Sequence, residues 1–232
     1  MIGPCVISSK SSTAGAVLVA AEVVLKALKH VWVSLEPLHA PMAVMGGLAL
    51  AAWRHVRATR DVDLLIGVSE EDLEPLLSAL TSAGLSPKHQ PPLISVGSLQ
   101  ILQLLYEPPG AYLDLQVDLL LAQSEYHKQA LARRMPTRLA ALDLDFSVLA
   151  CEDLILHKLW AGCLLDRADA AMLLRANRPD LNLEDLLGWT TTLSLGAELA
   201  QVWEDDTDRE IRANFDRLVR ATRTVVDPGV SF

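Results

Sequence analysis

The sequence predicts an α+β fold in two parts, a mixed α/β domain over residues 1–150 and a helical domain over residues 151–232. Short apolar runs in the first part, some with strict alternation of polar and apolar residues, are typical of strands. The second part has apolar residues at helical spacing almost throughout. With 51% of its residues hydrophobic, the 232-residue chain has ample material for a core and is not a disordered protein.

Periodicity, caps and breakers predict the elements of the first domain. The segment 112–122 alternates polar and apolar residues, which indicates a strand. Ser69 is a good helix N-cap and Gly84 a good helix stop, so we expect a helix between them. In chain order we expect helices over 14–31, 48–56, 69–83 and 124–134, strands over 42–45, 61–67, 98–106 and 112–122, one or two strands within 137–148, a loop at 87–92 and a turn at 107–110.

The second domain is expected to be helical almost throughout. Asn182 and Asp206 are placed where they can cap helices, because their short side chains accept hydrogen bonds from free backbone N–H groups. The expected helices cover 151–163, 166–176, 183–192, 195–203 and 207–225.

Composition limits the functions that the chain can have. A net charge of −9 and an isoelectric point near 5.1 argue against a broadly basic nucleic-acid-binding surface, but they allow a local basic groove or a nucleotide held through metal ions. Cys5, Cys151 and Cys163 lack metal-ligand spacing, so we expect free thiols in a reducing cytoplasm, with Cys151 and Cys163 in packing positions. The apolar helix at 14–31 carries too many charges for a membrane span, and we expect no membrane contact.

Two aspartates two positions apart are the strongest chemical signal. Asp61 and Asp63 lie in an apolar run that is expected to form a strand, in which alternate side chains share a face. Their Cα atoms would then be about 6.5–7 Å apart. Two ionised carboxylates in this arrangement repel each other, and a divalent cation between them removes the repulsion.

A third carboxylate would complete such a metal site, and Asp118 is the candidate. It lies in the alternating strand on the same face as Asp114, which is the alternative. If the two strands are neighbours, about 5 Å apart, Asp61, Asp63 and Asp118 converge on one point. Mg²⁺ suits such oxygen ligands because it keeps waters and takes substrate phosphates as further ligands.

Gly46 and Gly47 lie between an expected strand and an expected helix. Backbone N–H groups at a helix N-terminus bind phosphate, and glycine lets the phosphate approach closely. The pair therefore predicts a phosphate site, although a tight turn would use the same residues.

Together these motifs resemble the nucleotidyltransferase superfamily of DNA polymerase beta type, and within it the bacterial branch of abortive-infection and type IV toxin nucleotidyltransferases. The resemblance covers residues 42–187 and implies a nucleotidyltransferase-like mixed sheet flanked by helices and followed by a C-terminal helical bundle. It rests on Gly-Gly-x-Ala at 46–49, Arg-x-Thr-x-Asp-x-Asp at 57–63, the later Asp118, and Glu-Asp-Leu-Ile-x-x-Lys at 152–158.

The resemblance implies a role for each of these residues. Gly46 and Gly47 would hold the triphosphate of the nucleotide, although many superfamily members have serine in place of Gly47. Asp61, Asp63 and Asp118 would bind two Mg²⁺ ions, and Asp118 would also orient the attacking hydroxyl.

Charged residues complete the implied site. Lys158 would reach the nucleotide phosphates, and Asp166 and Asp169 match the acidic pair that follows this lysine in the branch. The residues alone also allow Lys158 on a helix surface and the two aspartates as local ion-pair partners. Arg60, like Arg57, would either pair with the aspartates or steer the anionic nucleotide.

The implied activity is Mg²⁺-dependent transfer of an NMP from an NTP such as ATP to a hydroxyl acceptor, with release of pyrophosphate. The acceptor would be an RNA such as tRNA, a protein or a small molecule, and the acidic charge favours a small one unless Arg133, Arg134 and Arg138 line a basic groove near the site. The branch also implies a toxin with an antitoxin protein as its partner. The alternative is a protein of the same fold that binds a nucleotide or a partner without catalysis.

Overall fold

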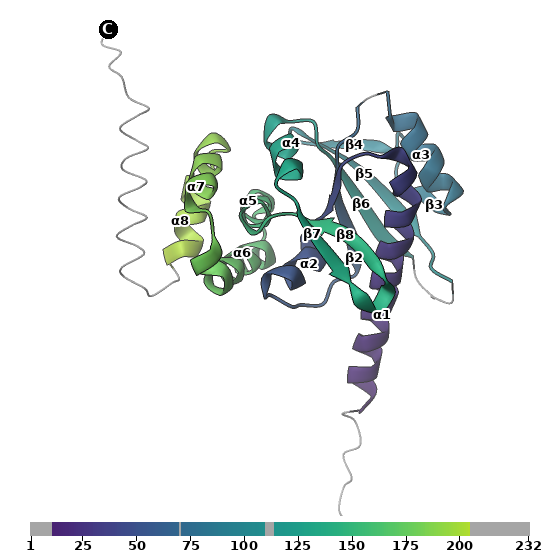
Figure 1. The fold of residues 1–232 in the computed structure, drawn as a ribbon, viewed down its shortest axis with the longest axis horizontal. Helices are drawn as coiled ribbons and strands as arrows, with labels where there is room; N and C mark the ends of the chain where they lie inside the picture. Colours follow the sequence, from purple (N-terminus) through teal and green to yellow (C-terminus); the bar gives the residue numbers. More distant parts are fainter. Residues whose placement is uncertain (1–10, 70, 110–113, 205–232) are drawn as a thin grey trace, which may run out of the picture. The chain divides into compact units, whose positions relative to one another are not determined.

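A mixed sheet with helices packed against it forms the first of two units in the computed structural model, which describes residues 11–69, 71–109 and 114–204 (Figure 1). The first unit takes residues 1–49 and 56–149, and the second takes residues 50–55 and 150–232. The second unit thus includes a short segment from within the first 150 residues, which a single boundary along the sequence does not capture.

Eight strands form the sheet within the described residues, in the order β3-β5-β6-β2-β1-β8-β7, with β4 also paired to β5. β2 is parallel to β6 and β1 is parallel to β8, while the other neighbours are antiparallel, so the sheet is mixed as predicted. The strands are β1 (Met42–Val44), β2 (Asp61–Ile66), β3 (Leu85–Pro87), β4 (Leu93–Val96), β5 (Leu99–Tyr106), β6 (Leu115–Leu121), β7 (Met135–Leu139) and β8 (Leu144–Val148).

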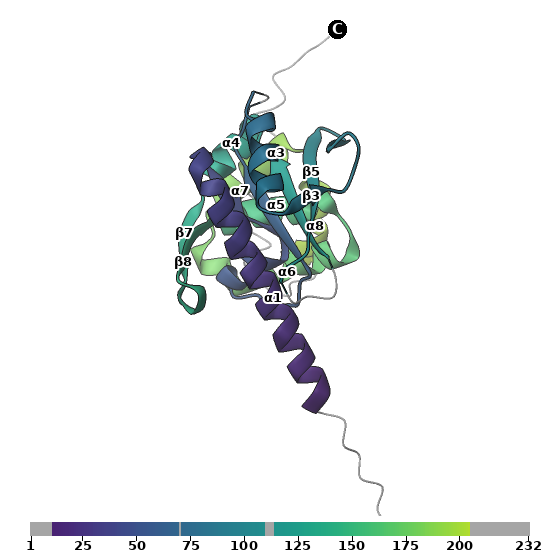
Figure 2. The same ribbon diagram turned by 90° about the vertical axis from the view of Figure 1, so that its right-hand side faces the viewer.

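Helices α1 and α3 cover one face of this sheet, side by side (Figure 2). α1 buries Val24, Leu28, Val31 and Leu35, whose spacing of three to four residues forms one apolar stripe. No helix in the described part of the chain is long and apolar enough to cross a membrane. The helices of this unit are α1 (Ser11–Leu35), α2 (Gly46–Ala49), α3 (Leu73–Ser82) and α4 (Glu125–Ala132), with 3₁₀ turns η1 (Glu36–Leu38) and η3 (Ala140–Leu142).

The second unit is helical, as predicted. In it α5 packs against α6 and α7, and α6 packs against α8 and the 3₁₀ turn η2. Asn182 caps α7 by accepting a hydrogen bond from the backbone N–H of Asp185, whereas the expected helix 207–225 and its cap Asp206 lie outside the described residues. The elements are η2 (Leu50–Trp53), α5 (Cys151–Ala161), α6 (Leu164–Asn177), η4 (Arg178–Asp180), α7 (Leu183–Thr192) and α8 (Gly196–Glu204).

Two predicted helices have different bounds in the structure. The helix expected over 48–56 is replaced by α2 and η2, and it ends at Trp53 because Arg54 adopts a left-handed conformation with φ +62°. The helix expected from Ser69 begins only at Leu73. Its start is delayed because both the backbone N–H and the hydroxyl of Ser69 donate to the carboxylate of Asp72, which forms a turn before the helix.

The loop predicted at 87–92 is present over 88–92, but the two short strands that flank it, β3 and β4, were not predicted, and both pair with β5. One further expectation is corrected. Cys151 is buried as expected, but Cys163 is exposed, so its predicted packing position was wrong. Its sulfur instead accepts a hydrogen bond from the backbone N–H of Asp166 at the start of α6. Cys5 lies outside the described residues.

Candidate active site

The three predicted carboxylates lie on two neighbouring parallel strands. β2 and β6 pair so that Asp61 is opposite Gln116 and Asp63 is opposite Asp118. Asp61 and Asp63 are half-buried and alternate with the buried Val62, so they share one face of the sheet as predicted. Because directly paired residues of neighbouring strands point to the same face, Asp118 shares that face, one strand spacing of about 5 Å from Asp63.

The register also separates the two candidates for the third carboxylate. Asp118 lies within β6, directly opposite Asp63. Asp114 is exposed and precedes the first residue of β6. The strand pairing therefore supports Asp118 as the neighbour of the β2 carboxylates.

Neighbouring side chains require glycine at both positions of the Gly46-Gly47 pair. Gly46 has φ +60°, and a Cβ there would lie 2.5 Å from Cγ and 2.8 Å from Cβ of Asp63. A Cβ on Gly47 would lie 2.6 Å from the hydroxyl oxygen of Thr59, which donates a hydrogen bond to Asp61. The pair therefore lets α2 lie directly against the carboxylate strand. Because α2 has only four residues, the helix-terminus argument for phosphate binding is weak, and the triphosphate role of the pair stays a prediction.

Two glutamines hold Asp118. Gln116 precedes it by two residues on β6, and Gln103 is directly opposite it on β5. The Gln116 amide nitrogen lies 2.9 and 3.0 Å from the two carboxylate oxygens, and the Gln103 amide nitrogen lies 3.2 and 3.3 Å from them. Neither glutamine was predicted from the sequence as a site residue, although the alternation of β6 already placed Gln116 on the face of Asp118.

The carboxylate side chains do not converge, although their strands are adjacent. Within the described residues, no group of three or more His, Cys, Asp or Glu side chains is arranged to hold a metal ion. The predicted meeting of Asp61, Asp63 and Asp118 at one point is therefore not seen, because each carboxylate is turned toward its own neighbour. The donor chemistry still fits Mg²⁺, since all three provide hard oxygen ligands from one face of two paired strands.

Lys158 is the centre of a buried charge cluster in the second unit. Its ammonium nitrogen is 2.7 Å from Asp166 and 3.0 Å from Asp169, whose side chain is only 1% exposed. Burial alone would lower the pKa of Lys158, but the hydrogen bonds and negative charges of Asp166 and Asp169 outweigh it and raise this pKa. The aspartates are therefore ion-pair partners of Lys158, as the residues alone allowed.

His55 also belongs to this cluster. It is the last residue of the 50–55 segment, which is part of the second unit. Its Nε2 lies 3.0 Å from Oδ1 of Asp169, so Nε2–H donates to the carboxylate whose other oxygen pairs with Lys158. His55 was not predicted from the sequence as part of this cluster, because more than a hundred residues separate it from Asp169. No periodicity or motif in the sequence connects the two positions.

Of the arginines singled out in the sequence, Arg60 lies next to the carboxylate strand, whereas Arg134 and Arg138 lie elsewhere in the first unit. Arg60 is exposed immediately before β2. Arg138 on β7 is three strands away from β2 and forms ion pairs with Asp143 and Asp145. Arg134 donates to the backbone carbonyl of Leu131 at 2.6 Å. A large RNA acceptor would be favoured if Arg133, Arg134 and Arg138 lined a basic groove near the site. Arg134 and Arg138 do not line such a groove.

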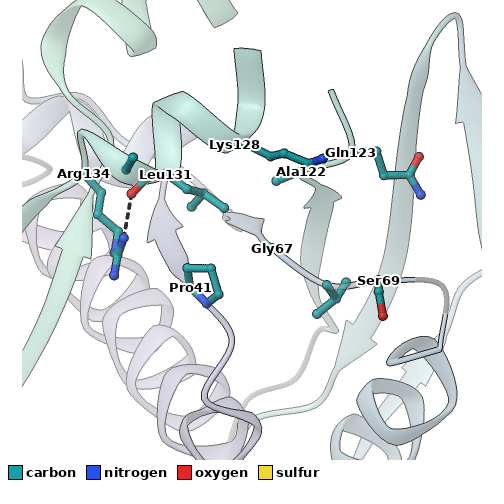
Figure 3. Close-up of a pocket in the computed structure, with 10 residues that line it drawn as sticks. Pro41, Gly67, Ser69, Ala122, Gln123, Lys128, Leu131 and Arg134 are labelled. Atoms are coloured by element: carbon teal, nitrogen blue, oxygen red, sulfur yellow. Dashed lines mark hydrogen bonds between the residues drawn. The ribbon is translucent and has the colours of Figure 1, made fainter. Parts of the chain in front are cut away.

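A cavity of about 730 Å³ lies beyond the C-terminal ends of β2 and β6 (Figure 3). Gly67 follows Asp63 by four residues and Ala122 follows Asp118 by four, so the cavity is about 13 Å along the strands from the carboxylates. It is separate from the candidate active site. Its lining comprises Pro41, Gly67, Val68, Ser69, Ala122, Gln123, Lys128, Leu131, Ala132 and Arg134.

Comparison with known protein families identifies the class of the chain. Residues 26–175 match the family described as nucleotidyl transferase AbiEii toxin, type IV toxin–antitoxin system. The chain belongs to this family. The match includes both carboxylate strands, Lys158 and its two aspartate partners, so the predicted motifs all fall within the matched region. This AbiEii family member is therefore a nucleotidyltransferase-type protein. No curated protein matches the sequence.

Several solved structures are similar to this AbiEii family member, with low identity. An antigenic nucleotidyltransferase-like protein from Paracoccidioides brasiliensis is 17% identical with a TM-score of 0.43, over 80% of this chain and 91% of that one. A putative nucleotidyltransferase from H. pylori is 16% identical with a TM-score of 0.46, over 84% of each chain. ANT(2″)-Ia in complex with adenylyl-2″-tobramycin is 14% identical with a TM-score of 0.48, over 78% of this chain and 98% of that one.

Proposed function

We propose that this AbiEii family member is a Mg²⁺-dependent nucleotidyltransferase that transfers an NMP from an NTP to a hydroxyl acceptor and releases pyrophosphate. The family supports the reaction class. The observation that carries the rest is the pairing of Asp63 with Asp118 on parallel strands, with Asp61 on the same face. Three carboxylates that share one face of two neighbouring strands provide the hard oxygen ligands that a divalent cation such as Mg²⁺ takes, which supports the proposal.

The residues of the chain act mainly by positioning. Bound Mg²⁺ ions would neutralise developing charge on the phosphates and align the attacking and leaving oxygens. Asp61 and Asp63 would provide ligands from β2, and Asp118 would provide one from β6 and orient the acceptor hydroxyl. Gly46 keeps α2 close to Asp63, so the carboxylate can occupy the space that a side chain would take. Arg60, exposed at the start of β2, would attract the nucleotide phosphates.

A small-molecule or protein hydroxyl is a better acceptor than a large RNA. The net charge of the chain is −9, and phosphate backbones bind through clustered lysine and arginine residues. Arg138 pairs with two aspartates, and Arg134 is bonded to a backbone carbonyl beside the distant cavity. An RNA acceptor such as tRNA therefore requires a basic surface that these two residues do not supply.

A partner protein follows from the family. Type IV toxins belong to toxin–antitoxin systems, so we propose that the chain acts as the toxin of such a pair. Co-expression with each neighbouring open reading frame, scored as restored growth, tests this part of the proposal independently of the acceptor.

One observation favours a second candidate, a protein of the same fold that binds a nucleotide without catalysis. The carboxylate side chains of the described residues form no ready cation site. If this arrangement persists in the presence of nucleotide and Mg²⁺, the chain would bind NTP and transfer nothing.

Pyrophosphate release distinguishes the two candidates. The purified chain is incubated with Mg²⁺ and each NTP, with aminoglycosides, total RNA or the protein itself as acceptor. Asp63→Ala and Asp118→Ala are the test variants, and Asp114→Ala is the matched control, because Asp114 is an exposed aspartate next to the same strand. Release that requires Mg²⁺, survives Asp114→Ala and disappears in the other two variants supports the proposal. NTP binding without release under every condition supports the non-catalytic candidate.

A further inference from the structure

Asp118 is the meeting point of two hydrogen-bonded chains of side chains. In the first, Lys88 donates to Oε1 of Gln116 at 2.8 Å, and Nε2 of Gln116 donates to Asp118. In the second, Nε2 of His89 lies 2.9 Å from Oε1 of Gln103, and Nε2 of Gln103 donates to Asp118. Two successive residues after β3 are thus linked to one carboxylate, each through its own glutamine.

The chemistry of the end groups fixes the orientation of both amides. An ionised carboxylate only accepts hydrogen bonds and an ammonium only donates them, so Gln116 must point its NH₂ to Asp118 and its oxygen to Lys88. Gln103 must likewise point its NH₂ to Asp118. Its oxygen then faces His89, which must carry its proton on Nε2. Neither glutamine can flip without losing a bond at both ends.

The backbone supports the same arrangement. Gln103 is directly opposite Asp118 in the antiparallel β5–β6 pair. The backbone N–H of Lys88 donates to the backbone carbonyl of Gln103 at 2.9 Å, which anchors the start of the loop after β3 to the same strand. Gln103 and Gln116 are half-buried, so their bonds to Asp118 are less exposed to competing water than bonds on an open surface.

We infer that Gln103 and Gln116 are positioning residues for Asp118, and that Lys88 and His89 hold the two amides in place. This inference rests on the proposed function. The amide donors stabilise the ionised carboxylate and hold it from the β5 side and from its own strand. A carboxylate has about four lone-pair sites, so two amide donors leave acceptor capacity for a divalent cation. Hydrogen-bonded supports of this kind around a ligand carboxylate set its orientation and its affinity for the metal.

Mn²⁺ binding to the full chain, measured by calorimetry, tests the inference without depending on catalysis. The variants are Gln103→Met and Gln116→Met, which keep the side-chain length and remove the amide. The control is Gln100→Met, because Gln100 also lies on β5 but bonds to Gln123 at 3.1 Å and does not contact Asp118. We expect each test variant to weaken Mn²⁺ binding about 10- to 100-fold, and the control to bind as wild type does.

Activity gives a second readout. In the two test variants, the Mg²⁺ concentration for half-maximal transfer should rise while the rate at saturating Mg²⁺ recovers most of the wild-type value, which loss of folded protein would not produce. Asp118→Asn should weaken Mn²⁺ binding if Asp118 is a ligand. If Asp118→Asn does so but both test variants bind Mn²⁺ with wild-type affinity, this inference is overturned and the proposed function stands. A wild type that binds no Mn²⁺ overturns the proposed function and this inference together.

Discussion

Replacing Gly46 with alanine should disrupt the carboxylate strand more than it disrupts the local backbone. Gly46 has φ +60°, a conformation that costs an L residue about 1–2 kcal/mol. The new methyl group would also lie 2.8 Å from Cβ of Asp63 and 2.5 Å from its Cγ, with the carboxylate oxygen closer still. Rotation of χ1 moves the carboxylate but leaves Cβ of Asp63 in place, so either α2 or β2 must shift.

Two terms make up the expected loss of stability. The positive φ contributes about 1 kcal/mol, since part of its cost is offset by the smaller entropy of the unfolded alanine chain. Moving Asp63 from its rotamer and its backbone position adds about 1–2 kcal/mol. The free energy of unfolding should therefore fall by about 2–3 kcal/mol.

Gly97→Ala separates these terms. Gly97 has φ +61° in the turn between β4 and β5, and a Cβ there would have no heavy atom within 4 Å apart from those of Gly97 and its two chain neighbours. It shares the backbone conformation of Gly46 without the contact to Asp63, so its variant should lose only about 1 kcal/mol. Urea denaturation of both variants measures the difference, which is the cost of displacing Asp63.

Transfer activity gives the functional half of the same prediction. A displacement of Asp63 by about 1 Å should reduce the rate about a hundredfold, while Gly97→Ala should keep wild-type activity. If the two variants lose equal stability and both remain fully active, then the contact between Gly46 and Asp63 has no role in the site, and the reasoning from the glycine pair is refuted.

Three further predictions follow from buried titratable groups. Lys158→Met should lower the free energy of unfolding by about 3–5 kcal/mol, because it leaves two aspartates without their cation. If guanidinium denaturation shows that this free energy falls by less than about 1 kcal/mol, the buried ion pairs are contradicted. Burial lowers the pKa of His127 to about 4, so between pH 6.5 and 4 the unfolded chain takes up a proton that the native protein does not. The free energy of unfolding should therefore fall by roughly 3 kcal/mol as the pH drops over this range. Thermal melts of His127→Asn should show a smaller fall, and an equal fall would refute the assignment. Burial raises the pKa of Cys151 to about 12, so iodoacetamide at pH 8 should leave it unmodified while the exposed Cys163 reacts, and mass spectrometry that finds both labelled equally would count against the burial.

The placement of the carboxylates was predictable because it depends on a local rule. Strand periodicity puts Asp61 and Asp63 on one face whatever the rest of the fold does. The sequence also identified Asp118 in a second apolar strand, and β2 and β6 are indeed neighbours. What the pattern could not supply was the rotamer of each carboxylate. That rotamer depends on hydrogen bonds with Thr59 and Gln116, two residues away, and on Gly46 and Gln103, which tertiary structure brings near.

The supporting residues were hidden for a different reason. Gln103 becomes a neighbour of Asp118 only through the register of the β5–β6 pair, and the Glu-Pro-Pro-Gly turn predicted at 107–110 is not a two-residue hairpin turn that would set this register. His55 reaches Asp169 because the chain returns to the second unit for six residues. Neither the Gln103–Asp118 pair nor the His55–Asp169 pair leaves a periodic signal in the sequence. The residues in chemical motifs could therefore be predicted, and these two hydrogen-bond partners could not.

The same geometry changes the expected role of Lys158. An ammonium group within 3.0 Å of two carboxylates is already more than neutralised, so its cluster carries a net negative charge unless His55 is protonated. A nucleotide phosphate that approached Lys158 would have to compete with Asp166 and Asp169, and separating a buried lysine from them costs several kcal/mol. Attraction of the phosphates is therefore better assigned to bound cations and to the exposed Arg60, while Lys158 fixes α6 against α5 by pairing across the turn at Gly162. The lysine of the Glu-Asp-Leu-Ile-x-x-Lys motif then contributes to the proposed activity through the stability of the second unit.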